Sequence, residues 1–335
     1  MDMVVSNLLQ DLEDAGQSEN TIIFFYSDHG TGLPRHKRWL FDTGVKVPLI
    51  IYIPEAYKNI YPSDPGSVIN RLVSFIDLAP TVINLSNAEI PSTMQGQAFL
   101  GKALNTESEH VHIARGRMDE RYDMQRGVRT KDYKYLRYYE PSKPFIQFMN
   151  TPESGPLMTE LRKVQKAGKL SPEAKQLVAL VKPKESLFDL NVDPYEFNDL
   201  ARNPNYKDKL TELRGVHNQW MEKVLDVGLI PEAIIRDWER SKNKPIYQIL
   251  REDFKFYNDL LVMSSSNEEK VLLDGLNNPN EAVRYRAAIG IYNIDGKISD
   301  KTISLLQDKM HEDKIINVSI SAARALLRFG FESDD

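Results

Sequence analysis

The feature that most constrains this chain is a nearly continuous run of apolar, β-branched and aromatic residues at positions 21–26. A run of this kind predicts a β-strand that is covered on both faces, as in a parallel sheet. Apolar residues at helical spacing precede it between Val4 and Leu12, and a second buried-strand candidate extends from Val47 to Ile53. A helix, a strand, a loop and another strand in this order indicate a layered α/β fold.

The C-terminal region has a different pattern. From about Ile246 onward the sequence is almost entirely of helical type and is interrupted by short polar turns. Pairs of predicted helices recur at roughly 35–45 residues, a period typical of HEAT-like helical repeats. The pattern changes between Leu229 and Lys244, so we predict an α/β domain over residues 1–235 and helical repeats over residues 245–332.

Composition excludes several classes of protein. None of the 335 residues is cysteine, so this chain has no disulfide framework, no thiolate metal site and no cysteine nucleophile. The net charge of -5 comes from interspersed acidic and basic residues, without the concentrated basic face of a nucleic-acid binder. No apolar run approaches the ~20 residues of a membrane span. The first residues show no leader-peptide pattern, and we expect the chain to begin inside a domain.

A carboxylate and an imidazole stand where the first predicted strand ends. Asp28 and His29 follow that strand directly, and Gly30 lets the backbone turn away from it. Ligand sites in open α/β sheets lie beyond the carboxyl ends of strands, so these two side chains are candidate ligands of a divalent cation. The same tripeptide is also common in simple turns, and by itself it leaves both interpretations open.

Four stretches of this sequence, residues 20–30, 37–50, 75–81 and 187–200, together resemble motifs of the sulfatase family of the alkaline-phosphatase-like superfamily. Residues 20–30 are similar to the family's late metal-binding motif, and residues 37–50 are similar to its lysine loop. Residues 75–81 match a helix that packs behind the site, and residues 187–200 resemble the C-terminal subdomain. The likeness is greatest to bacterial relatives of heparan N-sulfoglucosamine sulfohydrolases. It implies the C-terminal part of a sulfatase-type mixed sheet with flanking helices and a small C-terminal subdomain, followed here by the all-α repeat region.

The resemblance also implies roles for individual residues. Asp28 would be a calcium ligand with His29 beside it, and Lys37 would contact the sulfate oxygens as the sulfur is attacked. Four further side chains are candidate substrate contacts, because cationic groups suit an anionic sugar. These are Arg35, His36, Arg117 and Arg121. Exposed loop positions explain the first two at least equally well, and a solvated hairpin surface explains the last two better. The expected substrate is a sulfated carbohydrate, and the family's usual location is the periplasm or the cell exterior.

The family's nucleophile is missing from this chain. Sulfatases make formylglycine from Cys or Ser in a Cys/Ser-x-Pro-x-Arg motif, and they use an early pair of Asp ligands. The nearest candidate, which begins at Ser142, lacks the arginine and follows the late metal motif instead of preceding it. The nucleophile and the early ligands are therefore expected upstream, and the isolated chain is expected to show no turnover.

Two alternatives remain open. A phosphodiesterase of the same superfamily would bind two zinc ions through more histidines than this sequence places near the metal motif. Alternatively, the chain is an inactive remnant whose helical tail contacts another protein or packs on its own α/β domain.

Overall fold

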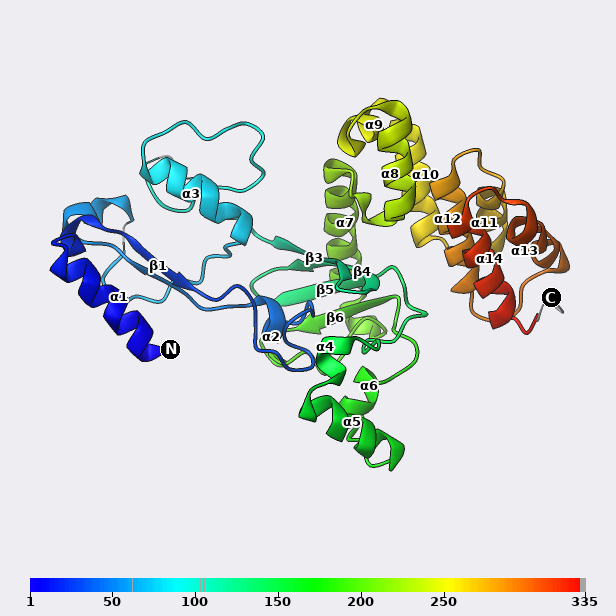
Figure 1. Cartoon of the computed structure of the whole chain (residues 1–335), viewed down its shortest axis with the longest axis horizontal. Coiled ribbons are helices and arrows are strands. Elements are labelled where there is room, and N and C mark those ends of the chain that lie inside the picture. Colours follow the sequence, from blue (N-terminus) through cyan, green and yellow to red (C-terminus); the bar gives the residue numbers. More distant parts are fainter. Residues whose placement is uncertain (62, 103, 105, 332–335) are drawn as a thin grey trace. The chain divides into compact units, whose positions relative to one another are not determined.

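The computed structural model describes all residues except 62, 103, 105 and 332–335 (Figure 1). The chain forms two compact units. The first comprises Met1–Ile113, Val128–Lys134 and Phe188–Asp199, and the second comprises Ala114–Gly127, Tyr135–Leu187 and Leu200–Asp335. Both helices and strands are present, as the predicted α/β class requires.

The first unit begins with a helix and a two-stranded ribbon. Its regular elements are α1 (Asp2–Asp14), β1 (Ile23–Tyr26), α2 (Asp42–Val45), β2 (Leu49–Tyr52) and α3 (Leu78–Leu85). Strands β1 and β2 pair in antiparallel register, with Ile23 opposite Tyr52 and Tyr26 opposite Leu49.

The prediction of a fully covered parallel strand at positions 21–26 was wrong for the described structure. Phe25 and Tyr26 are 39% and 46% exposed, and on β2 Ile50 is 60% exposed. A two-stranded ribbon leaves backbone edges and side-chain faces uncovered unless other strands or helices pack on it. The apolar sequence therefore identified a strand correctly but not its surroundings.

A four-stranded sheet follows, with strands in the order β3-β4-β5-β6. The strands are β3 (Val111–Met118), β4 (Arg121–Arg129), β5 (Tyr133–Tyr138) and β6 (Glu185–Asp189), and their residues are divided between the two units. Asp119, with a φ of 48°, lies in the tight turn that joins β3 to β4. The strand predicted around residues 187–190 corresponds to β6.

The second unit is mainly helical. Its helices are α4 (Asn150–Glu153), α5 (Pro156–Lys166), α6 (Pro172–Leu177), α7 (Lys207–Val224), α8 (Glu232–Lys242), α9 (Ile246–Glu252), α10 (Phe254–Ser265), α11 (Glu269–Leu276), α12 (Glu281–Tyr292), α13 (Asp300–Glu312) and α14 (Ile316–Arg328). Side-chain caps start α12 and α13, where Asn280 accepts from the Ala282 amide and Ser299 from the Thr302 amide. The helices of α11/α12 and α13/α14 pack in pairs. Their assignment to HEAT-like repeats remains a prediction.

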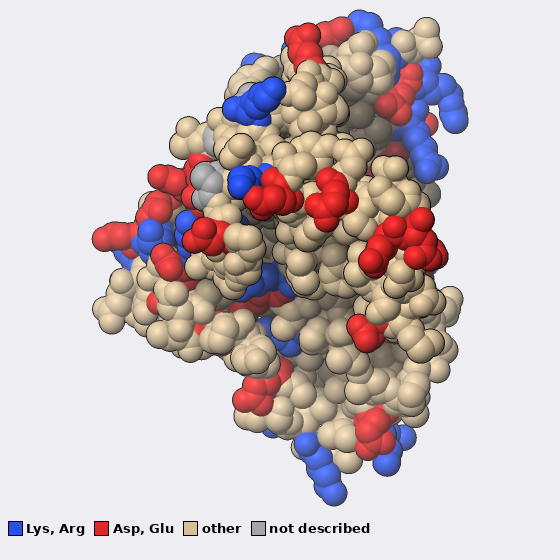
Figure 2. Space-filling model, turned by 90° about the vertical axis from the view of Figure 1, so that its left-hand side faces the viewer, with Lys and Arg blue, Asp and Glu red and all other residues tan. Residues whose placement is uncertain are grey.

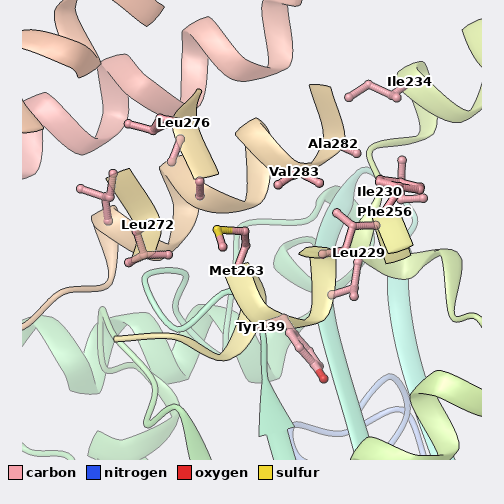
Figure 3. Close-up of a cluster of buried hydrophobic side chains, with 14 of the residues drawn as sticks. Tyr139, Leu229, Ile230, Ile234, Phe256, Met263, Leu272, Leu276, Ala282 and Val283 are labelled. Atoms are coloured by element: carbon pink, nitrogen blue, oxygen red, sulfur yellow. The ribbon is translucent and has the colours of Figure 1, made fainter. Parts of the chain in front are cut away.

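One hydrophobic core runs through this unit. It extends from Met124 on β4 and Tyr139, directly after β5, through Leu229 and Trp238, to Leu326 on α14. Figure 3 draws part of this core, including Tyr139 and Leu229. Buried members of this core lie on both sides of residues 235–245. The predicted domain bounds, 1–235 and 245–332, remain a prediction.

Two surface properties complete the description. No helix in the described part of the chain has both the length and the apolar character needed to cross a membrane. On the face drawn in Figure 2, acidic and basic side chains lie among broad uncharged areas.

Candidate metal and sulfate site

The candidate metal ligands lie directly after β1. The His29 Nδ1 is 2.7 Å from the Gly30 carbonyl oxygen, and since a carbonyl can only accept, Nδ1 carries the proton. In the neutral ring Nε2 then keeps its lone pair, and it lies 3.4 Å from the Asp28 Oδ2. The side chains of Asp28 and His29 are 82% and 36% exposed. A carboxylate oxygen and an imidazole nitrogen are thus presented together on an accessible edge.

These two donors fit part of a divalent-cation site. Calcium takes six to eight ligands, mostly oxygens, so Asp28 and His29 are too few to hold it alone. Within the described residues, no group of three or more His, Asp or Glu side chains is arranged to hold a metal ion. Any cation bound here requires further ligands, and the residues present are compatible with one side of its coordination shell.

The loop that carries Lys37 folds back onto the candidate ligands. The Lys37 amide donates to the Thr31 carbonyl (2.9 Å), and the Gly30 amide donates to the Gly44 carbonyl (3.0 Å). Both glycines are needed for this approach: a Cβ on Gly30 would lie 1.9 Å from the Thr43 oxygen, and one on Gly44 would lie 2.2 Å from the His36 oxygen. Close backbone packing therefore holds Lys37 in the loop that follows Asp28 and His29.

His36 lies in the same loop. Its Nδ1 is 2.8 Å from the Thr31 Oγ1. The side chain is partly buried and stands next to Lys37 in sequence. The predicted contact of His36 with substrate remains untested.

Arg35 lies in the same loop and contacts a distant segment of the chain. It is only 8% exposed, and its Nη2 donates to the carbonyl oxygens of Tyr195 (2.6 Å) and Glu196 (2.9 Å). Its guanidinium carbon lies 3.8 Å from the centre of the Phe41 ring and 4.4 Å from that of Phe197. Through these contacts Arg35 anchors the Lys37 loop to residues 195–197. The predicted contact of Arg35 with substrate stays a prediction.

A buried ionic cluster lies beneath this loop, and sequence reasoning missed it. The Lys134 side chain is fully buried, and its ammonium group lies 2.5 Å from the Asp42 Oδ1 and 2.8 Å from the Glu196 Oε1. Lys134 also donates to the Leu40 carbonyl at 3.0 Å. Arg129 Nη2 lies 3.0 Å from the Asp42 Oδ2. Two carboxylates and two cations thus join the loop to β4, β5 and the turn after β6.

The surroundings of the two carboxyl groups shift their pKa values in opposite directions. Burial outweighs the attraction of Lys134 and raises the pKa of Glu196. Burial also opposes ionisation of Asp42, but Lys134 and Arg129 together hold the pKa of that carboxyl below its usual value. The only sequence signal for this cluster was a lysine between two tyrosines in an alternating strand, and that pattern is equally typical of a surface strand.

The predicted substrate arginines on the β3–β4 hairpin belong to the second unit. Arg117 forms an ion pair with Glu232 (Nε to Oε1, 2.8 Å), and Arg121 donates to the Phe148 carbonyl at 2.5 Å. Each arginine is therefore engaged locally. Their predicted role in substrate binding is not tested by this geometry.

Comparison with known proteins agrees with the motifs. Residues 1–88 match the sulfatase family model. An ulvan-active sulfatase of Formosa agariphila is 42% identical over 248 residues, which cover 73% of this chain and 41% of that protein. The human N-sulphoglucosamine sulphohydrolase is 24% identical over 263 residues, covering 75% and 51%. The solved structure of a 2-O GAG sulfatase aligns with a TM-score of 0.48 at 22% identity, covering 67% of this chain and 41% of that one.

The chain belongs to the sulfatase family and corresponds to a C-terminal portion of it. It spans about half or less of the length of these two curated relatives.

Proposed function

We propose that this chain supplies one side of a sulfatase active site that hydrolyses sulfate esters or N-sulfate groups on a sulfated glycan. The observation that supports this most directly is the loop in which Asp28, His29 and Lys37 follow β1, within the residues that match the sulfatase family. The names of the two curated relatives indicate ulvan and N-sulphoglucosamine as substrates of those proteins. A sulfated sugar is the substrate class common to both.

In this proposal each residue has one task. Asp28 and His29 would contribute a carboxylate oxygen and an imidazole nitrogen to a calcium ion, which when bound would neutralise charge on the sulfate oxygens. Lys37 places an ammonium group against the same oxygens, where negative charge develops as the S–O or S–N bond breaks. The Arg35 contacts and the ionic cluster keep this loop in place, so that Lys37 does not have to be ordered during the reaction.

The attacking group, a formylglycine hydrate, would come from polypeptide outside this chain. The exposed apolar surface of the first unit supports this part of the proposal. No residue of α1 is buried, and Val4 and Leu8 are 62% and 63% exposed. A helix normally buries its apolar side against a sheet or another helix, so α1 and the β1–β2 ribbon are suited to contact the remainder of a sulfatase domain.

A chimera tests the proposal. The part of the Formosa relative that precedes its matched region would be fused to this chain, and turnover measured with calcium on a sulfated ulvan oligosaccharide and on an N-sulfated glucosamine. We expect the chain alone to be inactive and the chimera to release sulfate from at least one substrate. Asp28→Asn and Lys37→Met should each abolish most of that release, whereas Lys46→Met, at an exposed position nearby, should not.

Two outcomes would reject the proposal. One is a folded chimera without turnover of either substrate. The other is turnover that survives both Asp28→Asn and Lys37→Met. The first outcome would instead favour the alternative of an inactive remnant with an interacting helical tail.

A further inference from the structure

Helix α14, near the C-terminal end of the chain (Figure 1), has two apolar faces. On one face Ala322, Ala325 and Leu326 are buried in the core of the second unit, where α14 packs mainly on α12 and α13. A helix at the outside of a bundle normally turns polar residues to solvent on its other face. On α14 that face is apolar as well, and we call it the outer stripe. It consists of Ile316, Ile320, Ala323 and Leu327.

The outer stripe is exposed along its whole length. Ile316, Ile320 and Leu327 are 69%, 53% and 61% exposed, and the small Ala323 is partly buried. Their spacing of four, three and four residues puts them on one line of the helix, over about 16 Å. The neighbouring helix α13 exposes polar side chains instead, namely Lys301, Ser304, Gln307, Asp308 and His311. An apolar surface is therefore specific to α14 at this end of the unit.

The arginines that flank the stripe are held away from it. The guanidinium carbons of Arg324 and Arg328 lie 5.4 and 5.3 Å from the centre of the Tyr292 ring. Arg328 also donates to the carbonyl oxygens of Tyr292 and Ile294, the latter at 3.1 Å. These contacts fix both side chains against the C-terminal end of α12, so the stripe stays open for another surface.

The order of residues in the stripe makes it complementary to a second copy of itself. The midpoint between Ile320 and Ala323 is also the midpoint between Ile316 and Leu327. In an antiparallel pair of α14 helices related by a two-fold axis at this point, Ile320 lies opposite the partner's Ala323, and Ile316 lies opposite the partner's Leu327. A large side chain opposite a small one lets the two helices approach closely and interdigitate. Such a symmetric contact is the commonest kind in homo-oligomers.

The charges at the two ends of α14 favour the same orientation. Arg328 is exposed at the C-terminal end, and the exposed Glu312 lies just before the N-terminal end. An antiparallel pair brings these opposite charges near each other twice and also opposes the two helix dipoles. A parallel pair would instead place Arg328 beside the partner's Arg328 and Ile320 against the partner's Ile320.

We propose that the outer stripe is a self-association surface, through which α14 pairs antiparallel with α14 of a second copy. The largest apolar patch on a typical monomer covers about 300–600 Å², and a standard stable interface buries about 800 Å² on each partner. A single helix face lies below the second value, so the dimer is weak, with a Kd of about 10–100 µM. The surface includes neither Asp28 nor Lys37, so it does not depend on the proposed turnover.

Sedimentation equilibrium on the intact chain tests this surface, over concentrations from about 1 to 500 µM. We expect the mean mass to rise from that of the monomer towards that of the dimer. Ile320→Asp places a charge in the apolar contact and should raise the Kd about tenfold or more. The matched control Leu8→Asp changes another exposed apolar residue of a helix, 63% exposed on α1, and should dimerise like the unmodified chain.

Three outcomes of sedimentation would overturn the proposal. The chain could stay monomeric at the highest concentration, which would leave the stripe to another protein or to polypeptide outside this chain. Ile320→Asp could associate as strongly as the unmodified chain. Association could also be lost in Leu8→Asp but kept in Ile320→Asp, which would assign it to the first unit.

Disulfide cross-linking tests the antiparallel orientation. The chain has no cysteine, so any disulfide must come from the introduced residues. Chains carrying Ile320→Cys and chains carrying Ala323→Cys would be oxidised separately and as an equal mixture. Antiparallel pairing predicts that the mixed disulfide forms several-fold more than either disulfide between identical chains. A predominance of disulfides between two Ile320→Cys chains would indicate a parallel pair and contradict the proposal.

Discussion

Replacing Lys134 with methionine tests whether the buried ionic cluster holds the candidate active-site loop. Methionine has a similar length and no charge, so the substitution removes the ammonium group with little change in volume. It leaves the Asp42 and Glu196 carboxylates, whose side chains are 11% and 0% exposed, with Arg129 as the remaining cation bonded to Asp42.

The expected loss of unfolding free energy follows from the burial of these carboxylates. Removing one partner of a buried ion pair typically costs about 3–5 kcal/mol, because the other charge remains in a medium of low polarity. Glu196 can limit the loss by taking up a proton, since burial already raises its pKa while Lys134 is present. We therefore expect Lys134→Met to lower the unfolding free energy by an amount near the lower end of this range, about 3 kcal/mol at pH 7.

The loss should depend on pH in a defined direction. A carboxyl whose pKa in the folded state exceeds its unfolded value favours folding when protonated, and this advantage disappears as the pH rises through the folded-state pKa. Without Lys134 the pKa of Glu196 should rise further. The variant should therefore lose more unfolding free energy at pH 7 than near pH 4.5, which is the ordinary pKa of a glutamic acid side chain.

Hydrogen exchange of peptides covering residues 39–46 is the direct measurement. The amides of Gly44 and Lys46 bond to the Phe41 and Asp42 carbonyls, so their exchange reports opening of α2. A loss of about 3 kcal/mol corresponds to roughly 100-fold faster exchange. The control Lys102→Met removes an exposed lysine from the same unit. Exchange in Lys134→Met that stays within about fivefold of the unmodified chain, a change of about 1 kcal/mol, would refute the reasoning.

Three further predictions concern the loop and the tail. Gly44→Ala should lower the free energy of unfolding in urea by about 1–3 kcal/mol, because the new Cβ would meet the His36 carbonyl at 2.2 Å. Lys37→Met should leave that free energy nearly unchanged but lower the turnover of the chimera about 100-fold or more. In the tail, burial opposes ionisation of Asp313, but Arg284 outweighs it and lowers the pKa of that carboxyl below 3.8. Its contribution to stability is complete above that value and is lost as the pH falls through the lowered pKa, so the Tm difference between the unmodified chain and Arg284→Gln should shrink from pH 6 to pH 3.

Each of these predictions has a control or a contrary result. Gly32→Ala is matched to Gly44→Ala, because its Cβ would meet no atom within 4 Å, and equal losses in both variants would contradict the steric argument. Full turnover of the Lys37→Met chimera would exclude contact between Lys37 and the sulfate. If the Tm difference between the unmodified chain and Arg284→Gln did not change with pH, protonation of Asp313 would not contribute to the acid sensitivity of the tail.

The sequence by itself determined the local features of this protein. The order of Asp28, His29, Gly30 and Lys37 could be read directly, because a strand end and a glycine-containing loop are encoded by neighbouring residues. Helical spacing likewise predicted the paired helices beyond residue 245, and the strand near residue 187 was correctly found. These features depend on backbone preferences and on patterns only a few residues long.

Only the tertiary structure decided which side chains meet. Arg35, a candidate substrate contact in the sequence, is buried against the carbonyls of Tyr195 and Glu196, some 160 residues away. The ion pair of Lys134 with Asp42 and the hydrophobic core that crosses residues 235–245 are likewise contacts between distant segments. No local pattern encodes them, because burial and charge pairing depend on how the whole chain packs, and the same residue types are equally suited to a solvated surface.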